Sequence, residues 1–223
     1  MGFRRAVVSF FLKGILSILC KIDYREYFRT LSNNKPMILM INHINFLEVA
    51  ILTSFGYPFY VTGLAKSETW KNPFFAFLFN TYKAVPINRE GAFSDSFKKV
   101  CEAVQGGSFV CVAPEGTRSR DGVLSKGKAG IVQLALGGNI AVLPVAHFGG
   151  ECIWKNIRRL KRTPFNIRPG RPFRIKFDGR PDHEKREEIL TEMMVQMAQL
   201  LPEQMRGIYS HEAGNECKYL DFI

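Results

Sequence analysis

The sequence lacks the cysteine patterns that mark a metal site or a disulfide framework. Its 223 residues contain five scattered cysteines, and no C-x-x-C pair occurs among them. The odd number and irregular spacing argue against zinc ligation and against a fully paired disulfide framework. We therefore expect a protein of a reducing compartment. The cysteines are Cys20, Cys101, Cys111, Cys152 and Cys217.

Acidic residues are scarce relative to basic ones. The chain has 20 Asp and Glu against 31 Lys and Arg, which gives a net charge of +11. Such an excess favours a polyanionic partner, namely a nucleic acid, an anionic bilayer or a phosphorylated substrate. A basic surface without a specific partner is the alternative.

Internal repeats, low-complexity tracts and Ser/Gly-rich linkers are also absent, and 223 residues suffice for one domain with a substantial core. An apolar content of 46% excludes a disordered chain. The 19 phenylalanines fit a core, an acyl pocket or a membrane-facing surface, and composition does not choose among the three.

No apolar run is long enough to cross a bilayer, which takes about 20 residues. Residues 1–22 come closest, but Lys13 interrupts the run and no small-residue cleavage site follows it. We expect an amphipathic helix in the membrane interface, with its lysines toward the headgroups. A helix packed on the core is the alternative. The polar stripe of this helix is formed by Arg5, Ser9, Lys13, Ser17 and Lys21.

In the rest of the chain, short apolar runs alternate with segments of helical periodicity. This pattern predicts an α/β fold with a mostly parallel central sheet flanked by helices. Residues 67–82 are expected to form a short helix and a second helix that begins near Pro73. The expected strands are 37–42, 59–65, 84–88, 108–114, 140–149 and 171–179. The other expected helices are 46–55, 94–107, 128–139 and 183–206.

The stretch MINHINFLEVA places two polar residues in apolar surroundings. His43 follows a predicted strand, and Glu48 lies in the first turns of the predicted helix after it. A carboxylate bonded to one imidazole nitrogen fixes the tautomer and leaves the other nitrogen to accept a proton. No G-x-S-x-G elbow supplies a nucleophilic serine. We expect His43 to be a general base for a substrate hydroxyl, and a purely structural histidine is the alternative.

A second candidate site is the turn that follows the predicted strand at 108–114. It contains Glu115, Gly116, Thr117 and Arg118. Glycine allows a ligand to approach the backbone closely, and hydroxyls with an arginine fork suit phosphate oxygens. An ordinary charged turn is the alternative for this segment alone.

Further cations lie near other predicted strand and helix ends. Lys126 and Lys128 precede a predicted helix, whose N-terminus attracts anions. The predicted strand at 84–88 leads to Arg89. Chemistry in parallel sheets lies beyond the carboxyl ends of strands. The combination therefore predicts acyl or phosphoryl transfer that involves a phosphorylated alcohol.

Four motifs in this order resemble the glycerolipid acyltransferase family, the 1-acylglycerol-3-phosphate (lysophosphatidate) acyltransferases. They are NH-x4-acid, VPINR, PEGTRS and VLPVA, and they span about residues 35–150. The resemblance implies a glycerol-3-phosphate acyltransferase-like domain at 23–223, with His43 as general base and Glu48 where the family usually has aspartate. It implies that Pro144 supports the acyl-donor side. It also implies glycerol phosphate contacts from Arg89, Glu115, Gly116, Thr117 and Arg118, to which we add Lys126 and Lys128.

Glutamate in place of aspartate extends the side chain by about 1.5 Å, and misplacement near 1 Å costs on the order of 10²-fold in rate. We expect the local backbone to compensate, because the phosphate motifs are intact.

The implied reaction transfers a fatty acyl group from acyl-CoA or acyl carrier protein to the free hydroxyl of 1-acylglycerol 3-phosphate, giving phosphatidate. It needs no acyl-enzyme, metal or cofactor. We expect a phospholipid surface as partner and a peripheral or monotopic location on the cytoplasmic side of the cell membrane. Nucleic acid is not expected, because aromatic residues are not interleaved with cations. The alternatives are a catalytically impaired lipid-binding protein and an acyltransferase for another lyso-lipid.

Overall fold

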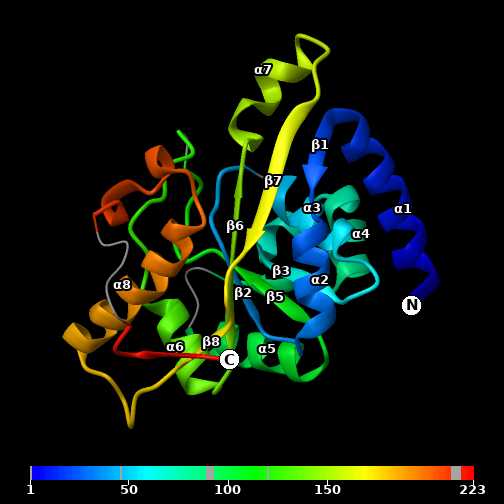
Figure 1. Cartoon of the computed structure of the whole chain (residues 1–223). Coiled ribbons are helices and arrows are strands. Elements are labelled where there is room, and N and C mark those ends of the chain that lie inside the picture. Colours follow the sequence, from blue (N-terminus) through cyan, green and yellow to red (C-terminus); the bar gives the residue numbers. More distant parts are fainter. Residues whose placement is uncertain (1, 46, 89–92, 120, 212–216) are drawn as a thin grey trace.

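A central β-sheet organises the molecule (Figure 1). The computed structural model describes residues 2–45, 47–88, 93–119, 121–211 and 217–223. Within these ranges, nine strands form one sheet in the order β1-β7-β6-β2-β5-β3-β4, with β8 beside β6 and β9 beside β8. The strands are β1 (Cys20–Asp23), β2 (Ile38–Ile41), β3 (Val61–Lys66), β4 (Val85–Ile87), β5 (Phe109–Val112), β6 (Val142–Phe148), β7 (Thr163–Pro169), β8 (Phe173–Ile175) and β9 (Leu220–Phe222).

The predicted mostly parallel sheet is confirmed. Strands β2, β3, β4, β5 and β6 run parallel to one another, whereas β7 and β8 run antiparallel to β6. Every residue of β2 is buried, as is every residue of β5. Strands buried on both faces need helices on both sides, which explains their continuous apolar runs.

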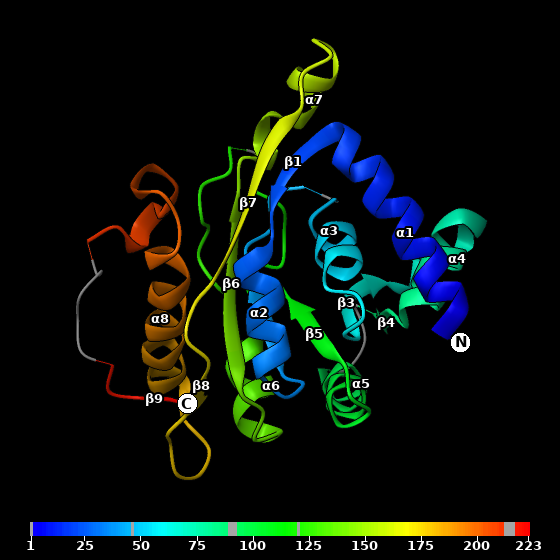
Figure 2. The same ribbon diagram turned by 45° about the vertical axis from the view of Figure 1, so that its right-hand side comes forward.

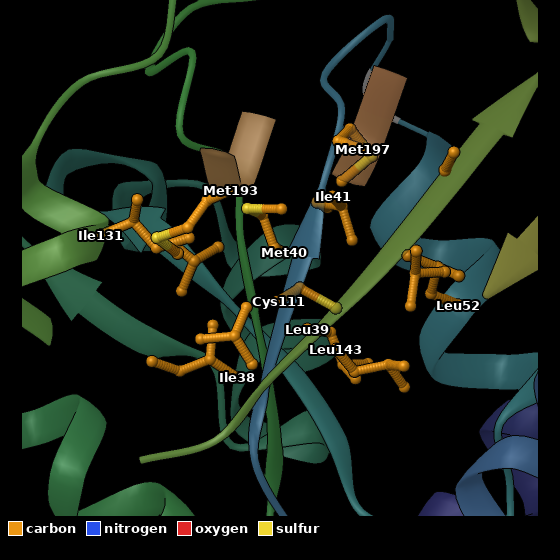
Figure 3. Close-up of a cluster of buried hydrophobic side chains, with 14 of the residues drawn as sticks. Ile38, Leu39, Met40, Ile41, Leu52, Cys111, Ile131, Leu143, Met193 and Met197 are labelled. Atoms are coloured by element: carbon orange, nitrogen blue, oxygen red, sulfur yellow. The ribbon is translucent and has the colours of Figure 1, made fainter. Parts of the chain in front are cut away.

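Helices cover both faces of the sheet (Figure 2). Helices α2 and α3 lie on one side of the sheet, and α8 lies on the other, where α6 packs against it. Figure 3 shows Met40 on the same side of β2 as Ile131 and Met193, whereas Leu39 lies toward Leu52. The helices are α1 (Gly2–Leu19), α2 (Arg25–Asn33), α3 (Leu47–Phe55), α4 (Pro73–Tyr82), α5 (Phe93–Gln105), α6 (Gly130–Gly137), α7 (Ile153–Ile157) and α8 (His183–Gln199).

Each strand and helix predicted from residue 37 onward is present, with shifted ends. The predicted helix at 183–206 ends at Gln199, and a 3-10 turn (Glu203–Met205) follows Pro202. Other 3-10 turns are Ser67–Lys71, Gly150–Cys152 and Gly207–Tyr209. Strands β1, β7 and β9 and helices α2 and α7 had no counterpart in the sequence predictions.

The N-terminal part of the polar stripe of α1 contacts the protein, whereas Ser17 and Lys21 are exposed. The predicted direction of the lysines toward headgroups is therefore wrong for Lys13, whose Nζ lies 5.7 Å from the ring centre of Phe55.

Arg5 is only 5% exposed, and its guanidinium donates to the carbonyl of Pro58 and lies 3.7 Å from the ring centre of Tyr60. Ser9 Oγ lies 2.9 Å from the hydroxyl oxygen of Tyr82. These contacts satisfy polar groups that burial would otherwise penalise.

Several large apolar side chains of α1 point away from the protein, although Leu16 is buried in the core. Phe3 is 84% exposed and Phe10 is 75% exposed. The helix ends at Leu19, because Cys20 begins β1 and joins the sheet beside β7. In the part of the chain that the structure describes, no helix is both long and apolar enough to span a bilayer.

Candidate functional site

His43 and Glu48 are in contact between the end of β2 and the start of α3. Glu48 Oε1 accepts a hydrogen bond from His43 Nδ1. The carboxylate is fully buried, and its Oε2 accepts the amides of Ile44 (3.2 Å) and Asn45 (2.8 Å). Because Nδ1 donates to the carboxylate, Nε2 is the nitrogen that is left to accept a proton. The His43 side chain is 27% exposed, so a ligand has access to it.

The local sequence explains why the acid reaches the ring. Asn45 Oδ1 accepts the amide of Leu47 (2.8 Å), which forms an Asx turn at the entrance to α3. This turn directs the amides of Ile44 and Asn45 toward the carboxylate of Glu48, which lies in the first turn of α3. The charge also lies near the helix N-terminus, where a carboxylate is favoured.

The turn after β5 is attached to the backbone of His43 at two points. Glu115 Oε1 accepts the amide of His43 (2.7 Å), and the amide of Ser119 donates to the carbonyl of His43 (2.7 Å). Glu115 Oε2 accepts the amide of Ser125 (3.0 Å), so both carboxylate oxygens bind backbone. Burial raises the pKa of the Glu115 carboxyl, and these two amide bonds offset part of the rise.

Residues 116–118 span the distance between these two attachment points. Gly116 has φ +70°, a conformation that suits glycine. A Cβ there would lie 3.1 Å from Lys128 Nζ, so the lysine side chain lies directly over this glycine. Thr117 and Arg118 are exposed beside it. The loop that is attached to the His43 backbone thus carries the Thr117 hydroxyl and the Arg118 guanidinium, and the Lys128 ammonium lies beside it.

The Acyltransferase family model matches residues 21–147, which is more than half of the chain and includes every motif from Asn42 to the end of VLPVA. The chain belongs to the acyltransferase family.

Individual relatives agree with this family assignment. The chain is 31% identical over 120 residues to the 1-acyl-sn-glycerol-3-phosphate acyltransferase LPAT1, chloroplastic, of Arabidopsis thaliana, covering 53% of this chain and 33% of that protein. It is 30% identical over 120 residues to the 1-acyl-sn-glycerol-3-phosphate acyltransferase of Pseudomonas aeruginosa, covering 52% and 46%. The matched segment therefore spans about a third to a half of the length of these relatives.

A solved structure has a similar fold. The 1-acyl-sn-glycerophosphate (LPA) acyltransferase PlsC from Thermotoga maritima superimposes with a TM-score of 0.62 at 19% identity, covering 96% of this chain and 81% of that one. At this identity the likeness shows a shared fold, in which helices flank a mostly parallel sheet.

The remaining predicted site residues of this family member are spread more widely. Lys126 Nζ pairs with Glu187 Oε2 of α8 at 3.1 Å, so it faces α8. Pro144 is buried within β6, opposite Met40 of β2. Arg89 lies outside the described residues, and its role stays a prediction.

Sequence reasoning missed His147 of β6, which is buried behind the His43–Glu48 pair. Its Nε2 lies 2.6 Å from the carbonyl oxygen of Asn42 and 3.7 Å from Glu48 Oε2. Asn42 also exchanges two side-chain bonds with the backbone of His147, both 2.8 Å long. His147 thus holds the peptide that leads into His43. The available signal was a histidine within an otherwise apolar strand.

Proposed function

We propose that this protein transfers a fatty acyl group from an acyl thioester to the free hydroxyl of 1-acylglycerol 3-phosphate, giving phosphatidate. The observation that carries the proposal is the contact between the buried Glu48 carboxylate and His43 Nδ1, because it leaves His43 Nε2 without a hydrogen bond to the described residues. The shared family and the names of the relatives support the choice of reaction.

His43 acts as the general base in this proposal. Its Nε2 takes the proton of the acceptor hydroxyl as that oxygen attacks the thioester carbonyl. Glu48 stabilises the imidazolium that forms and holds the ring in its orientation. The tetrahedral intermediate then collapses, the carbon–sulfur bond breaks, and the thiolate takes the proton back from His43. The acyl group passes directly to the acceptor without an acyl-enzyme.

Cations near the turn after β5 bind the acceptor phosphate. Arg118 is exposed two residues after Gly116, the exposed Lys128 lies over that glycine, and Thr117 adds a hydroxyl donor. Because Glu115 and Ser119 tie this turn to His43, a phosphate bound there leaves the acceptor hydroxyl near the base. Arg89 and Lys126 complete the proposed set. The donor is acyl-CoA or acyl carrier protein, and Pro144 supports its side of the site.

The lipid acceptor requires contact with a membrane. We propose peripheral or monotopic docking on the cytoplasmic side of the cell membrane, through the exposed aromatic side chains of α1 and α4. Phe10 and Phe11 of α1 are 75% and 63% exposed, and Phe74 of α4 is 63% exposed. The net charge of +11 adds attraction to anionic lipid. All five cysteines are free, which suits a reducing compartment.

Release of free thiol by the purified chain in detergent tests the proposal. Acyl-CoA and acyl carrier protein serve as donors, and lysophosphatidate, glycerol 3-phosphate and other lyso-lipids serve as acceptors. We expect lysophosphatidate to give the fastest turnover. His43→Gln should lower kcat on the order of 10²–10⁴-fold. Glu48→Asp should cost on the order of 10²-fold, because the shorter acid falls short of the ring.

His183→Gln is the matched control, because His183 is exposed at the start of α8. It should leave turnover unchanged. Equal turnover by wild type and His43→Gln would refute the general-base role. A wild type that is inert with every acceptor but still binds vesicles would favour the lipid-binding alternative.

A further inference from the structure

A strongly basic hairpin projects from one end of the molecule (Figures 1 and 2). We define the basic hairpin as residues 153–163, which comprise α7 and the turn that leads into β7. No acidic residue occurs between Glu151 and Asp178. The hairpin cations are Lys155, Arg158, Arg159, Lys161 and Arg162.

These cations have no acidic partner in the described part of the chain: none of the ion pairs found there includes them. Two large apolar side chains lie among them. Trp154 is 54% exposed, and Leu160 is 97% exposed in the turn. Leu160 also has φ +52°, a conformation that leucine rarely adopts. Because it is almost fully exposed, the side chain of Leu160 buries almost no apolar surface in the folded protein.

The basic hairpin is nevertheless internally ordered. The carbonyl of Asn156 accepts the amides of Arg159 (3.0 Å) and Lys161 (2.9 Å). The Asn156 side chain donates to Thr163 Oγ1 (3.1 Å), and Ile153 is buried at the base. The exposed cations and apolar side chains are thus held on a formed scaffold.

The base of the hairpin adjoins both the candidate site and α1. Asn45, two residues after His43, donates its side-chain amide to the carbonyl of Gly150 (3.2 Å). Arg162 donates to the carbonyl of Cys20 (2.9 Å), directly after the end of α1. Both views show α7 and the C-terminal end of α1 at the same end of the molecule (Figures 1 and 2).

We propose that the basic hairpin is a contact site for an anionic phospholipid surface, separate from the apolar faces of α1 and α4. Its cations bind headgroup phosphates, while Leu160 enters the acyl region and Trp154 lies at the interface. An apolar tip surrounded by unpaired cations matches a bilayer better than an acidic protein, whose surface offers charge but no hydrocarbon layer. The inference goes beyond acyl transfer and does not depend on catalysis.

Co-sedimentation of the full chain with vesicles tests this inference. The probe vesicles are pure phosphatidylcholine or phosphatidylcholine with phosphatidylglycerol, at low ionic strength. The triple variant Arg158→Gln, Arg159→Gln and Lys161→Gln should bind the anionic vesicles on the order of 100-fold more weakly. Leu160→Asn keeps the backbone, since asparagine accepts positive φ, and should bind both vesicle types on the order of tenfold more weakly.

A triple variant of equal charge at the opposite end of the molecule is the control. It carries Lys35→Gln after α2, Lys98→Gln in α5 and Arg180→Gln before α8, all three of them exposed. It should retain most of the binding to anionic vesicles. Thiol release in detergent should be the same for both triple variants, so failure of the proposed function is detected separately from failure of docking.

Two results would overturn the inference. The first is equal loss of vesicle binding in the two triple variants, which would reflect net charge alone. The second is unchanged vesicle binding of the hairpin variant together with weakened binding to purified acyl carrier protein, which would make the hairpin a protein-docking element.

Discussion

Buried polar side chains hold His43 by its ring, its backbone and the residue before it. Glu48 binds the ring, Glu115 binds the amide, and His147 binds the carbonyl of Asn42. His147 is fully buried, and its Nδ1 has no hydrogen-bond partner among the described residues. Burial lowers the pKa of His147. The negative charge of Glu48 and the hydrogen bond to the Asn42 carbonyl act in the other direction and offset part of this lowering of the pKa. His147 is therefore neutral in the folded protein and donates from Nε2.

This buried neutral histidine predicts that the protein loses stability in mild acid. The unfolded chain binds a proton at His147 near pH 6.5, whereas the folded chain resists it, so the free energy of unfolding falls as pH drops from 6.5 toward the lower folded pKa. The slope from this residue is at most about 1.4 kcal/mol per pH unit. Urea denaturation at several pH values measures it.

His147→Gln is the comparison, because glutamine keeps an N–H donor and does not titrate. The difference in unfolding free energy between wild type and this variant should narrow as pH falls from 7.5 to 5.5. Glu48, His43 and Glu151 also act on His147 electrostatically, so the difference between the two proteins is the relevant quantity. A difference that is constant over this range would contradict a neutral buried His147.

The sequence was sufficient to predict that His43 meets Glu48, because both lie in one short segment. It also predicted that Glu115 follows a neighbouring strand. It did not predict that Glu115 would bind the His43 amide, or that His147 would support Asn42. The first contact depends on the register of β2 against β5, where Met40 pairs with Val112. The second depends on the register of β2 against β6, where Ile41 pairs with Val145. Registers between distant strands are not visible in a single segment.

At the scale of whole elements, the missed structure lies in three stretches, 20–33, 150–169 and 220–222. Strand β7 contains two prolines, which normally argue against an internal strand. Helix α2 is only nine residues long, and the i,i+4 pair that it buries, Tyr27 and Leu31, was overlooked in the sequence. In α1 the helix itself was predicted correctly, but Arg5 and Ser9 face inward. The segment between α3 and β3 offers Arg5 a carbonyl and an aromatic ring, and Tyr82 of α4 offers Ser9 a hydroxyl.

The inverted polarity of α1 predicts opposite effects for its polar and apolar residues. Arg5→Met should lower the free energy of unfolding by about 2–3 kcal/mol, because it removes a buried charge-assisted bond and the contact with the Tyr60 ring. Phe10→Ser, at a 75% exposed position, should change it by less than about 0.5 kcal/mol. Urea denaturation measures the free energy of unfolding of both variants. A larger loss of this free energy for Phe10→Ser than for Arg5→Met would refute this orientation of α1.

At the scale of the whole molecule, side-chain packing at the two ends of the central strand β6 supports different parts of the protein. Phe173 of β8 pairs with Val142 at the amino end of β6 and is fully buried. Phe165 of β7 is equally buried, but its ring stacks on His147 at the carboxyl end of β6, 5.4 Å between centroids. Packing at the first end supports only the fold, whereas packing at the second also supports the candidate site.

These two phenylalanines allow a matched test of that division. Phe173→Leu and Phe165→Leu should each lower the free energy of unfolding by about 1–2 kcal/mol. Only Phe165→Leu should also lower kcat for thiol release, on the order of tenfold, because it releases His147 and thereby Asn42 and His43. The measurement is kcat at a temperature where both variants are fully folded. Equal kcat in the two variants would contradict the division.

The double attachment of the 115–119 turn to the backbone of His43 has an evolutionary consequence. In the proposed function, a substitution that reshapes this loop to fit a different headgroup also displaces the imidazole, since the Glu115 side chain and the Ser119 amide join the loop to His43. Under that proposal, selectivity and speed are inherited as one trait. A descendant that switches acceptors then has to realign its histidine in the same step.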